Sequence, residues 1–201
     1  MVIDKNEFFN NFKRAKSRYK ELQDVSITLR FGKSPFFTMQ ALLEPISLFQ
    51  KKKKYFVLIN LKRTDFLSQL SEDNILGWFG HELAHIVEYE KLTNLNLFVF
   101  AVKYLFDSKF RYFVERSTNA FAFNNGFALE LFLVWKKFIS MDIKDINYKK
   151  YILENYCPHW ADIKETAQNF GISKQIYESM KQTKVVNFKT TAKIKNKIKS
   201  K

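Results

Sequence analysis

The sequence has 201 residues, 46% of them hydrophobic, which is enough for one domain with a substantial core. Its single cysteine, Cys157, excludes an intramolecular disulfide, and residues 1–10 lack the apolar run of a signal peptide. We therefore expect a cytoplasmic protein. The formal net charge is +14, and residues 181–201 hold eight lysines and no acidic residue, so more than half of this charge lies there.

The segment 181–201 also lacks apolar periodicity, which predicts a disordered basic tail after a single domain over residues 1–180. Such a tail allows weak contact with nucleic acid or an anionic surface. Lysine, asparagine, isoleucine and phenylalanine are frequent throughout, so the charge alone does not indicate a specific partner. The longest apolar run, 95–106, contains Asn96 and Lys103 and is too short to span a bilayer, so we expect no transmembrane segment.

In chain order, the first predicted elements are a helix and three strands. Apolar residues at helical spacing predict an amphipathic helix over residues 4–23. Alternating apolar residues then predict a strand over 25–31, and a second strand follows a turn, over 36–43. The four lysines at 51–54 favour an exposed hairpin loop over an anion site. The strongest strand signal in the chain comes next, at 55–61.

A short helical turn at 65–70 is expected before the central helix of the chain. That helix should begin after Ser71, a good N-cap, because Glu72 and Asp73 follow where the helix dipole favours negative charge. It should extend to about residue 90 and carry a broad apolar face, as a helix crossing a core does.

The C-terminal half predicts further helices. The apolar segment 92–106 favours a buried or half-buried helix over one that rests on a membrane. Asp107 and Ser108 offer a cap for the next helix, which Gly126 should break or kink. The remaining helices are expected at 127–139, 148–156 and from Pro158 to near Gly171.

The central helix contains the sequence His81-Glu82-Leu83-Ala84-His85. Residues four apart share one face of a helix, so His81 and His85 can bind one metal ion, and neutral imidazole suits Zn²⁺. Glu82 lies beside the two ligands, where a general base for a metal-bound water should stand. The alternative is a helix with two solvated histidines and an ion-paired Glu82. The chain has only three histidines, which makes this spacing rare by chance.

A catalytic zinc usually takes three protein ligands and one water. The candidates for the third ligand are Glu88, Asp107, Glu115, His159 and Cys157. A straight helix would carry Glu88 away from an ion held by both histidines, and Asp107 better suits a helix cap. Glu115 lies 30 residues after His85, on a separate predicted helix that can pack against the first.

The pair of motifs, His81-Glu82-x-x-His85 and Glu115-x-x-x-Asn119 followed by alanine, resembles the gluzincins over residues 55–135. The small soluble forms called minigluzincins fit the chain length best. This resemblance implies an α+β, zincin-like core, in which a small twisted sheet packs on the metal helix and further helices lie C-terminal to it. It also implies Zn²⁺ held by His81, His85 and Glu115.

The same resemblance implies a zinc metallopeptidase that hydrolyses peptide bonds by a zinc-activated water, with Glu82 as the general base. Asn119 stands where the family usually has Asp, and should accept a hydrogen bond from a ligand histidine. Arg116, Ser117 and Thr118 should point elsewhere or to the flank, so their truncation should matter less. The family also implies a Tyr or His that stabilises the oxyanion, for which Tyr156 and His159 are the candidate catalytic positions.

An extended peptide or protein substrate would pair with an edge strand beside the cleft. The candidate is the strand over 55–61, and the strand over 36–43 is the alternative.

A non-catalytic protein is the main functional alternative. Its basic tail and aromatic-rich body would bind nucleic acid or another protein, and its zinc would be structural or absent. The intact Glu82 opposes this hypothesis, because a structural zinc site needs no general base. A third hypothesis combines the two, as a protease brought to nucleic acid by its tail, like the SprT-like proteases.

Overall fold

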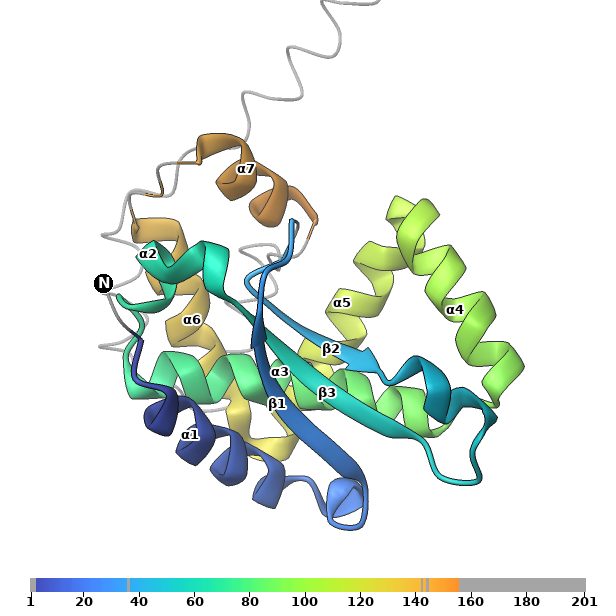
Figure 1. The fold of residues 1–201 in the computed structure, drawn as a ribbon. Coiled ribbons are helices and arrows are strands. Elements are labelled where there is room, and N and C mark those ends of the chain that lie inside the picture. The colour runs from blue at the N-terminus through green and yellow to red at the C-terminus, as the bar shows by residue number, and fades with distance from the viewer. Residues whose placement is uncertain (1–2, 36, 142, 144, 156–201) are drawn as a thin grey trace, which may run out of the picture. The chain divides into compact units, whose positions relative to one another are not determined.

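The computed structural model describes residues 3–35, 37–141, 143 and 145–155, and it has the expected mixture of helices and strands (Figure 1). These residues all belong to one compact unit within residues 1–160. The expected domain end at residue 180, the helix after Pro158 and the basic tail 181–201 lie outside the described residues. No helix in the described ranges is long and apolar enough to cross a membrane.

Three strands form one sheet in the order β1-β3-β2. The central strand β3 (Lys54–Asn60) runs parallel to β1 (Ser26–Gly32) and antiparallel to β2 (Met39–Leu43). The prediction that 55–61 is the substrate-pairing edge is therefore wrong. Its strong strand signal comes from burial at the centre of the sheet, where Val57 and Ile59 are fully buried. The alternative segment, 36–43, contains the edge strand β2.

Helix α1 (Lys5–Arg18) begins at the N-cap Asp4 and packs its apolar side on the core. The predicted helix over 4–23 ends earlier, because Tyr19 is extended and a short 3₁₀ turn, Lys20–Leu22, follows it. The Tyr19 hydroxyl donates a 2.6 Å hydrogen bond to the buried carbonyl of Gly80. This bond joins the end of α1 to the central helix.

The central helix α3 (Glu72–Glu90) follows the short helix α2 (Thr64–Leu67). It starts with the expected cap, since Ser71 and Asn74 form a reciprocal capping box. Thirteen of its nineteen residues are buried, between the sheet and α1 on one side and α6 (Ala128–Ser140) on the other (Figure 1). At Gly77 an added Cβ would lie 2.5 Å from the backbone of Glu130, so α6 approaches closely there.

Two antiparallel helices follow α3 and stand at one end of the sheet (Figure 1). They are α4 (Asn94–Phe106) and α5 (Ser108–Ala122), and Asp107 caps the second as expected. A π-helical segment, Phe123–Phe127, contains the expected kink, with Gly126 at a φ of 82°. It leads into α6, and the last described helix is α7 (Ile146–Asn155).

Helix α4 differs from the expected buried or half-buried helix. Only Leu97 is buried along it. Six large apolar side chains each expose at least 41% of their surface: Leu95, Phe98, Val99, Val102, Leu105 and Phe106. Packing on α5 covers one side of α4 and leaves this apolar side exposed.

The lysine run between β2 and β3 is only partly the expected exposed loop. Lys51 and Lys52 are exposed. The ammonium of Lys53 instead donates to the carbonyls of Tyr89 (3.2 Å) and Leu92 (2.7 Å), at the C-terminal end of α3. A helix C-terminus favours a cation, so Lys53 fixes the loop against this helix.

Candidate metal centre

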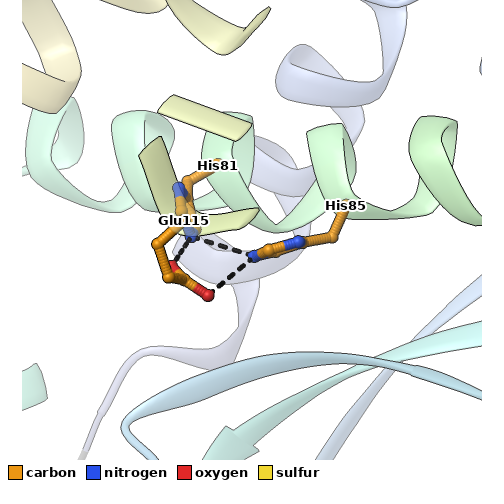
Figure 2. Close-up of side chains that lie close together, drawn as sticks. All are labelled: His81, His85 and Glu115. Atoms are coloured by element: carbon orange, nitrogen blue, oxygen red, sulfur yellow. Dashed lines mark hydrogen bonds and ion pairs between the residues drawn. The ribbon is translucent and has the colours of Figure 1, made fainter. Parts of the chain in front are cut away.

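The structure brings three predicted ligands together in the buried interior. His81 and His85 lie one turn apart on α3, and Glu115 extends from α5 between them (Figure 2). His81 Nε2 lies 3.1 Å from Glu115 Oε2, and His85 Nε2 lies 3.4 Å from Glu115 Oε1. The two Nε2 atoms are 3.2 Å apart.

These distances fit a metal site. Bonds of about 2.0–2.1 Å in a tetrahedral site place neighbouring ligand atoms about 3.3 Å apart. Each histidine Nε2 lies close to this separation from the other Nε2 and from one oxygen of Glu115, and one ligand atom from each residue lies within 4.8 Å of the others. The buried group of His81, His85 and Glu115 can therefore hold a metal ion.

Hydrogen bonds to the other ring nitrogens orient both histidines for this role. Nδ1 of His81 lies 3.0 Å from Oδ1 of Asn119, as predicted for that residue. Nδ1 of His85 lies 3.2 Å from Oγ1 of Thr118. In a neutral imidazole whose Nδ1 donates, Nε2 keeps the lone pair that a metal ion can take.

The position of Thr118 differs from the expectation that it points elsewhere or to the flank and matters less, since its hydroxyl contacts His85 directly. Residues three and four apart share a helix face, so Glu115 has both Thr118 and Asn119 beside it on α5. The Thr118 hydroxyl also donates to Oε2 of Glu88 at 3.1 Å. Glu88 is thus not one of the three grouped ligands, but it supports His85 through Thr118.

Tyr104 is a site residue that sequence reasoning missed. It comes from α4, and its hydroxyl donates a hydrogen bond to Oε1 of Glu115. Its ring meets that of His85 edge-on, with centroids 6.4 Å apart. The signal available in the sequence was a tyrosine within an apolar segment, which suits an ordinary core position equally well.

The electrostatics of the group favour a cation. Burial lowers the pKa of His81, but the hydrogen bond and charge of Glu115, together with Glu82, outweigh burial and raise it to about 9. Burial also acts to raise the pKa of Glu115, but the two histidines bring it well below its usual range. Glu115 is therefore an ionised carboxylate in a buried site, where a bound cation would be stabilised.

Glu82 lies on the side of the site that faces the sheet. It is buried, and its Oε2 accepts a 2.7 Å hydrogen bond from the backbone N–H of Ala41 in β2. Burial raises the pKa of Glu82, and the neighbouring histidines partly oppose this shift. A raised pKa brings a carboxylate closer to the range that suits a general base.

The edge of β2 is directed toward this site. Thr38 and Glu44, which flank β2, hydrogen-bond to β3 through their backbones. Alternate residues of an antiparallel strand direct their backbone N–H and C=O groups to opposite sides. The backbone groups of Met39, Ala41 and Leu43 therefore point away from β3. The bond between Ala41 and Glu82 shows that this free side meets α3.

A cavity of about 490 Å³ lies beside the two histidines, Glu82 and Glu115. Residues from β2, α3, α4, α6 and α7 line it, and most are apolar. Its apolar lining includes Leu42 and Leu43 of β2, Trp78 of α3, Phe98 and Leu105 of α4, and Trp135 of α6. A chain with apolar side chains could therefore lie next to the buried ligand group.

Three sequence candidates have no structural account. Tyr156, Cys157 and His159 lie outside the described residues. Asp107 is described, and it caps α5 rather than joining the ligand group.

A scan against models of known protein families gave no match, and searches of curated proteins and solved structures gave none either.

Proposed function

We propose that this protein is a zinc-dependent metallopeptidase of the gluzincin type. The observation that carries the proposal is the convergence of His81, His85 and Glu115, with Glu82 placed between this group and the free edge of β2. Two histidines and one carboxylate are the ligands of a catalytic zinc that keeps an open position. A structural zinc site would have no use for Glu82.

His81, His85 and Glu115 would hold the zinc, and the hydrogen bonds that the two imidazoles donate to Asn119 and Thr118 support them. When bound, zinc lowers the pKa of a water and polarises a carbonyl oxygen. Glu82 accepts the proton of the attacking water and delivers it to the nitrogen of the leaving amine as the peptide C–N bond breaks.

Tyr104 is the hydroxyl donor that the described residues place at this group, through its hydrogen bond to Glu115. We assign it as a candidate for stabilising the oxyanion of the tetrahedral intermediate. Tyr156 and His159 remain predictions for the same role.

The zincin-like core is part of the same proposal, supported by the small sheet packed on α3. An extended peptide would pair with the free edge of β2 by strand addition. Met39 and Leu43 would supply the backbone partners on either side of Ala41. This pairing would place the scissile bond near Glu82 and an apolar side chain of the substrate in the cavity.

The proposal is tested by metal analysis of the purified full chain, followed by digestion of a broad peptide library with and without 1,10-phenanthroline. We expect one zinc per chain and cleavage that the chelator stops and added zinc restores. Cleavage that persists in chelator would exclude the proposed mechanism. A metal-bearing protein that cleaves no peptide would favour the non-catalytic alternative.

A further inference from the structure

One exposed apolar surface extends beyond the proposed site. The α4 apolar face consists of Leu95, Phe98, Val99, Val102, Leu105 and Phe106. Their spacing of three or four residues places them along one side of α4, over the full length of that helix. Single exposed apolar residues are normal on a protein, but a continuous stripe marks an interaction surface.

Two further exposed apolar residues lie close to the start of α4. They are Ile46 (72% exposed) and Phe49 (90% exposed), in the 3₁₀ turn Pro45–Phe49 between β2 and β3. The side chain of Asn94, the first residue of α4, donates to the carbonyl of Leu48 in this turn. The turn therefore lies beside the N-terminal end of the α4 apolar face.

Basic residues outnumber acidic ones in the two segments that carry this surface. Residues 45–54 and 91–113 together contain eight basic residues and one acidic residue, Asp107. Lys51, Lys52 and Lys54 are exposed beside the turn that carries Ile46 and Phe49. An apolar surface bordered by lysines has the chemistry of a site that binds anionic lipid headgroups and inserts side chains below them.

We propose that the α4 apolar face docks on an anionic membrane surface. The helix would lie in the plane of the bilayer interface, since α4, with 13 residues, is too short to span it. A second copy of the chain fits less well, because both copies would bring the same basic residues together. A bilayer accepts protruding side chains such as Phe49 and Phe106 without a matching pocket.

Docking would also orient the candidate active site. Phe98 and Leu105 belong to the α4 apolar face and to the lining of the cavity beside Glu82. The cavity would then open near the membrane surface. This consequence rests on the proposed function, and it implies a substrate segment that is apolar and close to the membrane.

The test measures binding of the full chain to vesicles, without any peptide, so that its result does not depend on hydrolysis. Sedimentation is compared for phosphatidylcholine vesicles with and without about one quarter phosphatidylglycerol. We expect binding that requires the anionic lipid at low salt. A part of it should persist at about 0.5 M NaCl, because salt screens exposed charges but not inserted apolar side chains. The lysines of 181–201 contribute only to the salt-sensitive part.

The variant Leu95→Ser with Phe106→Ser removes two exposed side chains of the α4 apolar face that do not line the cavity. Its salt-resistant binding should be at least about tenfold weaker than that of the wild type. The matched control, Leu129→Ser with Ile146→Ser, removes two exposed apolar side chains from α6 and α7 and should bind like the wild type.

Three results would overturn the proposal. The wild type could show no salt-resistant binding to anionic vesicles. The α4 variant could bind as tightly as the wild type. Analytical ultracentrifugation without vesicles could show a dimer that the α4 variant dissociates, and the face would then be an interface between copies of the chain.

Discussion

Thr118 Oγ1 lies 3.2 Å from Nδ1 of His85. The same hydroxyl donates to the carboxylate of Glu88, so Thr118 connects His85 to a charged group. His81 has only the neutral amide of Asn119 at the corresponding position. The two candidate zinc ligands are therefore held by different partners, although both partners lie on α5.

This difference leads to a prediction for Thr118. Thr118→Val removes the acceptor for His85 and should lower zinc affinity by about 10–100-fold, the usual effect of losing a partner of a ligand histidine. Thr118→Ser keeps the hydroxyl and should bind zinc within a few-fold of the wild type. Competition with a chromophoric chelator measures both affinities. Equal affinities for the Val and Ser variants would show that the hydroxyl does not support the site.

At Asn119, unlike Thr118, we expect one substitution that does not lower zinc affinity. Its Nδ2 is buried and has no hydrogen-bond partner in the part of the chain that the structure describes. Asn119→Asp replaces this donor with a charged acceptor, which makes His81 a stronger ligand, so zinc affinity should at least equal that of the wild type. Asn119→Ala should weaken zinc binding in the same chelator competition. A large loss of affinity in the Asp variant would contradict the assigned hydrogen bond.

Glu115 and Glu88 should respond differently to truncation. Glu115→Ala removes one of three ligands and should lose zinc on dialysis against a mild chelator. Glu88→Ala removes only the carboxylate that accepts the hydrogen bond of the Thr118 hydroxyl, so zinc should remain bound, at reduced affinity. Atomic absorption after dialysis measures the zinc retained. If Glu88→Ala loses its zinc and Glu115→Ala retains it, the ligand assignment is wrong.

The close approach of α6 to α3 gives a prediction on stability. At Gly77 an added Cβ would lie 2.5 Å from the backbone carbon of Glu130, so Gly77→Ala must push the two helices apart. Overpacking of this kind costs about 1–3 kcal/mol, which exceeds the gain of up to about 1 kcal/mol in helix propensity. Urea denaturation measures the free energy of unfolding.

Gly32→Ala is the matched control, because its Cβ would meet only the Cδ1 of Leu58, at 3.0 Å. A flexible side chain can move where a backbone cannot, so this variant should be destabilised less than Gly77→Ala. A Gly77→Ala protein as stable as the wild type would show that the two helices are not packed this closely.

Much of this site could be predicted because its determinants are local. The spacing of His81 and His85, the cap at Ser71 and the periodicity of α5 all act within a few residues of the chain. The family resemblance implies Glu115 as the third ligand, and the packing of α5 on α3 is what brings it to the histidines. The four-residue spacing from Glu115 points to Asn119, whereas Thr118 reaches His85 from the three-residue position on the same helix face.

The features of the structure that differ from the sequence predictions depend on tertiary contacts. The sequence of β3 predicts a buried strand, but only its pairing with both β1 and β2 shows that it is central. The apolar residues of α4 suit a buried helix, and nothing local shows that the chain leaves one side of α4 uncovered. Tyr104 joins the site only because the turn at Asp107 returns α5 along α4.

The most direct test of the account is the hydrolytic activity of Glu82→Gln. This variant keeps the shape of the side chain but removes the base, so turnover of a library-derived peptide should fall at least about a hundredfold. Its zinc content should match that of the wild type, since Glu82 is not a ligand. Glu72→Gln, which changes an exposed carboxylate at the start of α3, should leave both unchanged. A Glu82→Gln protein that hydrolyses the peptide at the wild-type rate would contradict the proposed mechanism.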